Sequence, residues 1–419
     1  MRKILKVLDQ NLGYVLIIPA IIFMLLFSII PIFESTKYAF FDFQLNDQQK
    51  SGLYFNERYN MDLVNETYEY LDYYLDTELE VVTDEETKAQ IDSMRNVYSD
   101  QLNTIHNVFD ITEGILELSN DQAETLRKLD ENTYSMLDAL YERNKSPNGE
   151  LILEEDIYAV ASELETAYIA PNFTGVDNFK NIMKDDRVKG SLVITLIFTV
   201  ASVGLELVLG LMLALIMNKS MTGRGMIRTM SLIPWAIPTS VAALIWAYLY
   251  NGSNGIVAML LAKIGIIGNS ADLLLSGSSA LGAVIMADVW KTTPYMALLL
   301  LAGLQTIPGS LYEASSLDGA NKWQQFKNVT LPLLKPSIMV ALLFRTLDAF
   351  RVFDLIYVLT GGGPGGKTES ISIYAYKAMF AQTRFGYGSA VVLVMAVIVG
   401  IISYVYIKFL DVQLISDEG

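Results

Sequence analysis

The chain has 419 residues, of which 52% are hydrophobic and only 18% are charged, a composition typical of a protein with several membrane-spanning helices. It has no cysteine and one histidine, His106, which argues against disulfides, zinc sites and a Ser-His-Asp triad, so we expect neither an enzyme nor a cofactor. The net charge of −16 is uneven: residues 45–170 carry 29 acidic and 8 basic side chains, which leaves the rest at +5 and argues against nucleic acid as a partner.

Six apolar segments are long enough to cross a bilayer, which takes about 20 mostly apolar residues. They are residues 12–33, 191–217, 230–250, 280–304, 336–360 and 389–410. The first follows a basic N-terminus, as a signal peptide does, but its apolar run is too long and no small-residue cleavage site follows it. The sequence therefore predicts an all-α, polytopic membrane protein with six transmembrane helices.

Lys and Arg residues near the helix ends indicate the orientation of such a protein. With the N-terminus inside, ten of them lie on the cytoplasmic side, Arg2, Lys3 and Lys6 among them, against eight outside. An even number of spans then places both termini in the cytoplasm. We expect the protein to lie in a bacterial cell membrane, where its helices contact lipid directly.

The acidic segment between the first two spans is expected to lie outside the cytoplasm. Apolar residues recur every three or four positions there, which predicts amphipathic helices at 62–74, 85–98, 123–143 and 154–168, with a turn at 146–149. We divide the chain into a tail and first helix (1–44), an extracytoplasmic helical domain (45–171) and a membrane core (172–419). The domain is either a solvated spacer or a specific binding module.

The loop between the fourth and fifth spans, residues 305–335, has an unusual composition. Ser310 is a plausible N-cap for a short helix from 311 to about 318, and Gly319 can end that helix in a left-handed conformation. A second helical stretch, 322–329, should stop at Leu331-Pro332. Small residues after Glu313 allow a partner's backbone to approach closely.

This loop resembles the EAA loop of ABC-importer permeases. Glu313, Ala314 and Ser315 are followed after three residues by Gly319, and the spacing to Leu331-Pro332 is also kept. The resemblance implies that a coupling helix containing Glu313, Ala314, Ser315, Asp318 and Gly319 contacts a cytoplasmic ATPase. The alternative is an ordinary helix-turn-helix loop.

Other segments resemble the sugar-importing branch of this family, the MalF-type permeases. They are residues 172–179, 225–229, 348–354 and 360–364, so the resemblance covers about 172–410 but not the acidic insert. It implies a permease subunit that imports an oligosaccharide, of maltodextrin or galacto-oligosaccharide type, by alternating access. Its implied partners are a second, MalG-like permease subunit, two ATP-binding cassette ATPase subunits and an extracytoplasmic solute-binding lipoprotein.

Ionisable side chains inside membrane helices usually face a cavity or pair with one another. Arg345, Asp348, Arg351 and Asp354 recur every three residues, which predicts one helical face with alternating charge. By the resemblance, the sugar-contacting residues are Asp288, Thr292, Tyr295, Asp348 and Arg351. Charges stand where MalF-type proteins have asparagines, and a structural ion-pair ladder is the alternative; Glu206 is expected to be a structural partner.

Residues 361–368 match the phosphate-binding pattern G-x-x-x-x-G-K-[ST], but that pattern needs a preceding strand and a following helix of a soluble domain. Here it follows a membrane helix, so we interpret it as a glycine-rich loop. Three other functions remain possible: an importer of amino acids or phosphate, a receptor with an extracellular domain, and a proton-coupled transporter. The last would leave the EAA-like loop unexplained.

Overall fold

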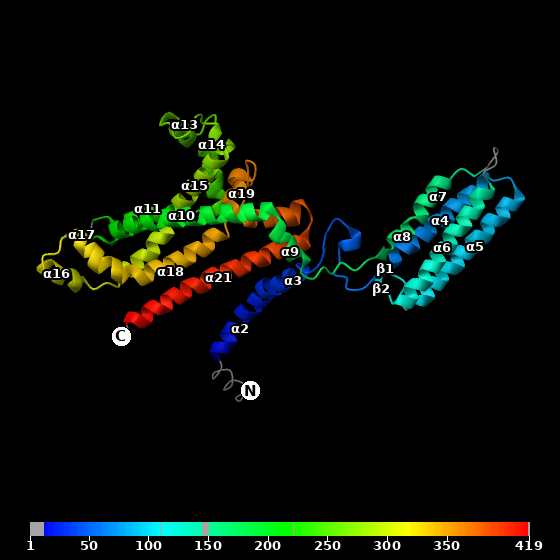
Figure 1. Cartoon of the computed structure of the whole chain (residues 1–419), viewed down its shortest axis with the longest axis horizontal. Helices are drawn as coiled ribbons and strands as arrows, with labels where there is room; N and C mark the ends of the chain where they lie inside the picture. Colours follow the sequence, from blue (N-terminus) through cyan, green and yellow to red (C-terminus); the bar gives the residue numbers. More distant parts are fainter. Residues whose placement is uncertain (1–11, 110, 145–150, 221, 418–419) are drawn as a thin grey trace. The chain divides into compact units, whose positions relative to one another are not determined.

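The computed structural model describes residues 12–109, 111–144, 151–220 and 222–417. The basic residues of the N-terminal tail and the turn expected at 146–149 lie outside these ranges. The chain forms two compact units (Figure 1): Phe40–Gly175, here called the inserted unit, and the segments Met1–Ala39 and Val176–Gly419 together, here called the membrane unit. Each is described by itself.

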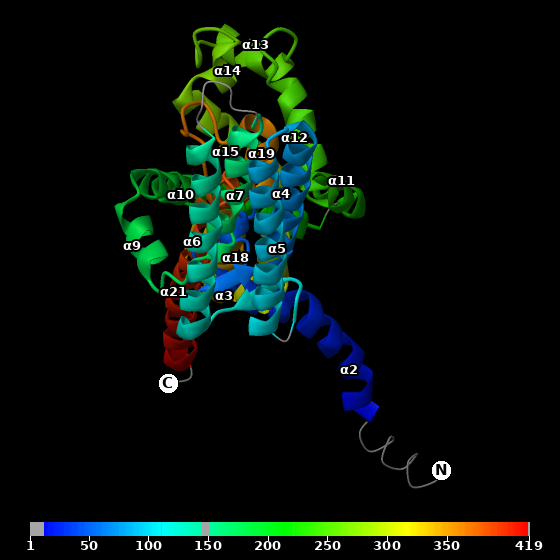
Figure 2. The same ribbon diagram turned by 90° about the vertical axis from the view of Figure 1, so that its right-hand side faces the viewer.

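The inserted unit is a helical bundle with a small sheet. Its long helices lie side by side in both views (Figures 1 and 2). The helices are α4 (Met61–Val81), α5 (Glu85–Val108), α6 (Asn120–Arg143), α7 (Glu154–Ala161) and α8 (Glu163–Thr166), preceded by the 3-10 turn η2 (Gln48–Lys50). Three of the expected amphipathic segments lie within single helices; the fourth, 154–168, is divided into α7 and α8 at Ser162 and ends in a strand at Tyr168. Their apolar faces meet in a core that includes fully buried Leu71, Leu75, Ile91, Leu126 and Leu137.

Local sequence signals define where these helices begin. Asn60 and Asp84 accept hydrogen bonds from backbone N–H groups in the first turns of α4 and α5. Ser119 and Gln122 form a reciprocal capping box at the start of α6.

A three-stranded antiparallel sheet was not foreseen. The strands β1 (Arg58–Asn60), β2 (Ile115–Glu117) and β3 (Tyr168–Ile169) pair in the order β2-β1-β3. Strands of two or three residues are too short to show alternation in the sequence. Tyr59, in the central strand, is fully buried, so the sheet closes one end of the bundle core.

The two ends of the inserted unit are hydrogen-bonded to each other. The Asp42 N–H donates to the Asn172 carbonyl at 2.8 Å, and the Thr174 N–H donates to the Phe40 carbonyl at 2.9 Å. Asn172 is also buried and its side chain receives the Tyr54 N–H at 2.9 Å. The chain therefore enters and leaves this unit at one place.

In the part of the chain that the structure describes, the regular elements of the membrane unit are all helices. Its helices are α2 (Leu12–Met24), η1 (Leu25–Ile29), α3 (Ile30–Tyr38), α9 (Asp177–Lys184), α10 (Asp186–Asn218), α11 (Arg224–Ala236), α12 (Thr239–Leu249), α13 (Ile256–Lys263), α14 (Asp272–Leu275), α15 (Gly277–Leu304), α16 (Gly309–Leu317), α17 (Lys322–Gln325), η3 (Phe326–Thr330), α18 (Leu331–Phe350), α19 (Asp354–Thr360), α20 (Ile371–Tyr376), η4 (Lys377–Ala381) and α21 (Phe385–Asp417). Within the described residues, five helices are long and apolar enough to cross a membrane, or six if a bent pair counts as one span.

That bent pair replaces the straight span expected at 230–250. α11 and α12 meet at an angle of 90°. Ile237 is extended because Pro238 follows it, and a residue before proline avoids the helical conformation. Lys291 of α15 donates to the freed carbonyls of Ile237 at 3.0 Å and Trp235 at 3.4 Å, so its charge stabilises the end of α11.

The span expected at 336–360 is also interrupted. α18 ends at Phe350, and the Arg351 side chain donates from Nε to the Leu347 carbonyl at 3.1 Å, which caps the last turn. Asp354 then begins α19, where a carboxylate favours a helix N-terminus. The prediction of one helical face running from Arg345 to Asp354 was wrong.

The core of the membrane unit lies where α10, α15 and α18 pack together. Close approach of α15 to α18 requires a glycine: a Cβ on Gly303 would lie 2.2 Å from Ser337 Oγ. The fully buried Leu300 and Leu334 belong to the same core. The charged groups described next lie on the same three helices.

Candidate substrate site and coupling segment

Arg345 of α18 is almost completely buried and is held by Glu206 of α10. Its Nε donates to Glu206 Oε2 at 2.5 Å, and its Nη2 donates to Glu206 Oε1 at 2.9 Å. The two side chains are 1% and 0% exposed, so water screens this bidentate pair very little. The pair gives Glu206 the structural partner that the sequence led us to expect.

Two further carboxylates bind the same guanidinium. Arg345 Nη2 donates to Asp288 of α15, and Nη1 donates to Asp348 Oδ2 at 3.0 Å. Thr292 donates to Glu206 Oε1 at 2.7 Å, which extends the network to a second position of α15. One cation thus joins three helices through three carboxylates, and removing it would leave buried charges without compensation.

A cavity of about 270 Å³ lies beside this network. Four of the five predicted sugar-contacting residues line it, and the fifth, Tyr295, does not. The lining side chains that matter here are Trp235, Asp288, Lys291, Thr292, Arg345, Asp348, Arg351 and Asp354.

The lining groups differ in what they can offer a ligand. Asp288 and Thr292 are buried and already bonded within the network, whereas the Asp348 side chain is 65% exposed. Lys291 is bonded to backbone carbonyls. Asp348 is therefore the predicted residue that is best placed to accept hydrogen bonds from a bound molecule.

Tyr295 takes part through Trp235, a residue that sequence reasoning missed. The two rings are stacked with centroids 5.5 Å apart and an interplanar angle of 15°. Trp235 lines the cavity and is 45% exposed. Its position between Pro234 and Pro238, at a helix break inside an apolar segment, was the available sequence signal.

The predicted coupling residues lie on α16 and the turn that follows it. Glu313, Ala314, Asp318 and Gly319 are exposed, and Ser315 is half-buried, with its Oγ donating to the Tyr312 carbonyl at 2.9 Å. Leu317 is 90% exposed, which is unusual for leucine and indicates a contact surface. The segment thus presents a small, partly apolar face.

Gly319 ends α16 as the sequence predicted. Its φ is +80°, its N–H donates to the Ser316 carbonyl, and the Ala320 N–H donates to the Ser315 carbonyl at 2.9 Å. These two bonds form a Schellman motif, for which glycine is the favoured residue.

Two local predictions for this loop were wrong. Pro308, not Ser310, occupies the N-cap position, and α16 begins at Gly309. The second stretch does not stop at Leu331-Pro332: the helical path continues from Lys322 to Phe350. Pro332 has no N–H group to donate to the preceding turn. That turn is the π-helix η3, whose hydrogen bonds are already rearranged, so the helix continues past the proline.

Gln325 ties the two arms of the loop together, a role not foreseen from the sequence. It is buried, and its Nε2 donates to Ser316 Oγ at 2.7 Å. Asn321 and Gln324 form a capping box at the start of α17. α16 is therefore attached to the helical path that leads into α18 and to Arg345.

Comparison with known proteins agrees with this architecture. Residues 206–414 match the family model described as "Binding-protein-dependent transport system inner membrane component". The chain is 47% identical over 236 residues to the trehalose/maltose transport system permease protein MalF of Thermococcus litoralis, covering 56% of this chain and 79% of that one. It is 44% identical over 255 residues to the trehalose transport system permease protein SugA of Mycobacterium tuberculosis, covering 60% and 80%.

A solved structure shares the fold. It is the bacterial alginate ABC transporter in complex with an alginate pentasaccharide-bound periplasmic protein, with a TM-score of 0.51 and 22% identity over 67% of this chain and 93% of that one.

The chain belongs to the binding-protein-dependent transport system inner membrane component family. It is a multi-pass membrane permease of an ABC importer and not an enzyme, which confirms the resemblance found in its EAA-like loop. Such a permease works with ATPase subunits and a substrate-binding protein.

Proposed function

We propose that this permease imports an oligosaccharide of the maltodextrin or galacto-oligosaccharide type, and that the cavity beside Arg345 is this subunit's part of the sugar site. The observation that carries the proposal is that an exposed carboxylate, Asp348, and an aromatic ring, Trp235, line one cavity, with Trp235 stacked on Tyr295. Relatives named as trehalose/maltose and trehalose permeases support the substrate class.

Sugar chemistry fits both features. Ring hydroxyls donate to carboxylates such as Asp348 and Asp354, and the C–H faces of a sugar ring pack on aromatic faces such as that of Trp235. Arg351 offers a further donor at the rim. Asp288, Thr292 and Tyr295 then contribute indirectly, because their contacts fix the positions of the groups that touch the sugar.

The cavity is a poor fit for phosphate, which a rival importer would carry. The Nε, Nη1 and Nη2 atoms of Arg345 all donate to carboxylates, and Lys291 donates to two backbone carbonyls. The charge of Arg345 is therefore balanced by carboxylates, and a dianion in the cavity would face the carboxylates of Asp348 and Asp354.

Membership of the family supports the assembly that we propose. A MalG-like second permease completes the pathway, a solute-binding lipoprotein delivers the sugar at the outer face, and two ATPases close on the coupling segments of the two permeases. In this chain Glu313, Ala314, Ser315, Asp318 and Gly319 form that segment. Both termini and α16 lie in the cytoplasm, and the inserted unit lies outside.

A substrate screen in the reconstituted importer tests the proposal. Binding protein and candidate sugars are added, and stimulated ATPase activity is measured. With the sugar that stimulates, Asp348→Asn should raise the KM for sugar-loaded binding protein about tenfold, since a charged acceptor is lost. Asp272→Asn, on α14 and away from the cavity, is the matched control.

Glu313→Lys separates the coupling role from the sugar site. It should abolish uptake and stimulated ATPase activity while binding protein still docks. Normal uptake by this variant would refute the coupling role, and stimulation only by amino acids or phosphate would refute the sugar assignment.

A further inference from the structure

A groove at the N-terminal ends of α10 and α15 has no part in the proposed sugar site. Two adjoining cavities, of about 640 and 740 Å³, share Gly190, Ile194 and Lys367 as lining residues, so they form one continuous groove. The α16 segment lies beyond the opposite end of α15, which is 28 residues and therefore about 42 Å long. The groove is thus remote from the coupling segment.

The polar part of the groove carries surplus positive charge. Four cations line it: Arg187, Lys189, Lys367 and Lys377. The carboxylate in the lining is Glu369, and a further one, Asp186, pairs with Lys189 at 2.8 Å on the exposed surface. Among the described ion pairs none involves Lys367, so the groove favours an anion.

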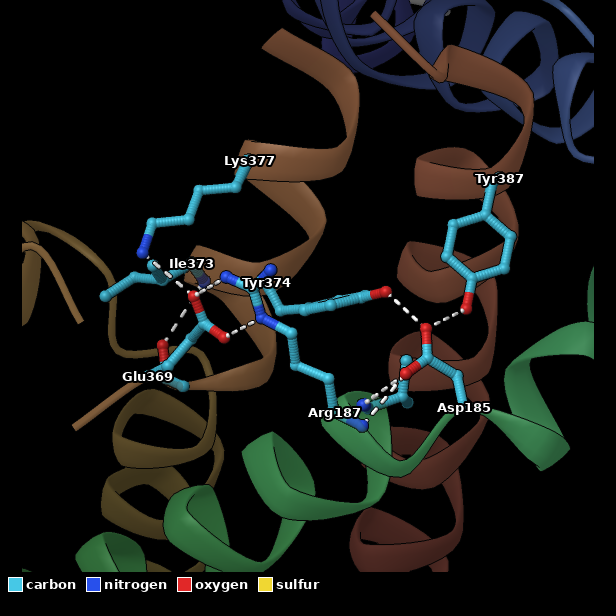
Figure 3. A network of polar contacts seen from close by, with 9 residues as sticks. Asp185, Arg187, Glu369, Ile373, Tyr374, Lys377 and Tyr387 are labelled. Carbon is cyan, nitrogen blue, oxygen red and sulfur yellow. Dashed lines mark hydrogen bonds and ion pairs between the residues drawn. The ribbon is translucent and has the colours of Figure 1, made fainter. Parts of the chain in front are cut away.

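A hydrogen-bonded network fixes two of the four cations, Arg187 and Lys377 (Figure 3). Glu369 is 1% exposed and accepts hydrogen bonds from Arg187 Nε at 2.7 Å, Arg187 Nη2 at 2.8 Å and Lys377 Nζ at 2.8 Å. Beside it, Asp185 accepts hydrogen bonds from the hydroxyls of Tyr374 and Tyr387 at 2.6 and 2.8 Å. The network joins the start of α10 to α20 and α21, so Arg187 and Lys377 are held in place without a ligand, whereas Lys189 and Lys367 stand outside it.

The remainder of the groove is aliphatic. It continues along α10 and α15 past Val193, Ile194, Ile197 and Leu281, and Val193 and Ile197 are 53% and 49% exposed. α10 is among the helices that are long and apolar enough to cross the membrane. Exposed aliphatic side chains on a helix of this kind suit contact with lipid hydrocarbon, and they line the same groove as the cations.

We propose that this groove binds an anionic phospholipid, with its phosphate between Lys189 and Lys367 and an acyl chain along Val193, Ile197 and Leu281. Cations above an aliphatic strip match the two ends of such a lipid, because a cation attracts the phosphate and aliphatic side chains pack against an acyl chain. The acidic surface of a soluble protein would match only the cations, because it cannot cover side chains that face hydrocarbon.

Gly277 is a positioning residue for this site. A Cβ on Gly277 would lie 2.6 Å from Lys367 Cγ and 2.7 Å from Lys367 Cβ, so the stem of Lys367 lies against the first turn of α15. Any side chain at position 277 displaces Lys367 and its loop. Gly277→Ala therefore alters the site without removing a charge.

Titration of the purified importer in detergent tests the proposal, with phosphatidylglycerol, phosphatidylcholine and inorganic phosphate as separate ligands. Phosphatidylglycerol should bind most tightly. The double variant Lys189→Gln/Lys367→Gln should weaken its binding about thirtyfold, and Gly277→Ala should weaken it severalfold. Lys180→Gln, an exposed lysine of α9 that pairs with Asp177 away from the groove, should leave it unchanged.

Three outcomes would overturn the proposal. If phosphatidylcholine bound as tightly as phosphatidylglycerol, the lysines would not contribute to binding through their charge. If inorganic phosphate bound as tightly as phosphatidylglycerol, the aliphatic strip would not contribute. If the lysine variant lost stimulation by binding protein but kept its phosphatidylglycerol affinity, the groove would be a docking site for an acidic protein surface. None of these titrations requires the transported solute, so they stay independent of the sugar assignment.

Discussion

At the scale of single residues, Arg345 is the most consequential side chain of the membrane unit. It is the common partner of Glu206, Asp288 and Asp348, which come from three helices. Loss of the cation leaves three carboxylates close together, whereas loss of one carboxylate leaves Arg345 with two partners. The two kinds of substitution should therefore differ in severity.

Arg345→Gln should destabilise the purified permease by about 3–5 kcal/mol, because it leaves the buried carboxylates of Glu206 and Asp288 without a cation. Glu206→Gln should cost about 1–3 kcal/mol, because Gln still accepts the Thr292 hydroxyl and Arg345 keeps Asp288 and Asp348. Thermal unfolding in detergent measures both. Equal losses, or a larger loss for Glu206→Gln, would contradict the arrangement.

Asp130 gives the inserted unit a dependence on pH. Burial raises the pKa of this carboxyl to about 6, although the Tyr168 hydroxyl donates to its Oδ2 at 2.6 Å. Among the described residues, its Oδ1 has no hydrogen-bond partner. The folded state must therefore ionise a poorly solvated group when the pH rises above that value.

The direction in which pH changes the stability depends on whether the folded or the unfolded state binds the proton of Asp130 more tightly. Between about pH 4 and 6 the folded state binds more protons at Asp130 than the unfolded state, so this residue's contribution to stability falls with rising pH and is lowest above about 6. Asp130→Asn should stabilise α6 at neutral pH, by up to about 3 kcal/mol, and change little near pH 4. Hydrogen exchange of α6 in the full-length chain, with both proteins compared at each pH, measures this; an equal effect at both pH values would contradict it.

At the scale of elements, the end of α16 depends on one backbone conformation. Gly319→Ala places a side chain on a residue with a left-handed backbone conformation. This should reduce the stability of the turn by about 1 kcal/mol and so loosen the coupling segment. Stimulated ATPase activity should fall severalfold. Gly309→Ala is the matched control at the other end of the same helix, where an added Cβ meets nothing within 4 Å; an equal fall for both would refute the role of the turn.

The sequence predicted the elements better than their interruptions. Amphipathic periodicity and apolar length located the four insert segments and most spans, and the Gly319 turn was correct because only local backbone geometry decides it. The break at Phe350 was missed, because repeated charges at a spacing of three suggest a continuous helical face. It depends on Arg351 capping α18 while Asp354 starts the next helix.

The candidate site was predictable in its residues but not in their roles. Asp288, Thr292, Asp348 and Arg351 do line one cavity. That Arg345 would engage Glu206 across 139 positions of the chain was not predictable, since such a contact depends on how α10, α15 and α18 pack. Trp235 was missed although Pro238 signals a helix break, because the sequence does not show that the resulting bend places Trp235 against Tyr295.

At the scale of the whole molecule, the absence of cysteine makes the orientation directly testable. Single cysteines at exposed positions, Glu131→Cys on α6 and Leu317→Cys on α16, introduce the chain's sole thiols. In cells that lack the ATPase subunits, we expect a membrane-impermeant maleimide to label Glu131→Cys in spheroplasts and to label Leu317→Cys only after the membrane is opened. The reverse pattern would place the coupling segment outside and refute the proposed topology.

The hydrogen-bonded pairing of Asp42 with Asn172 and of Phe40 with Thr174 has a consequence for how such a protein can change over time. Because the polypeptide departs from and returns to the permease at adjacent points, a whole folded module can be gained, lost or replaced there as easily as a surface loop is lengthened. This junction is a natural place to graft a foreign domain, with the transport machinery left as it is.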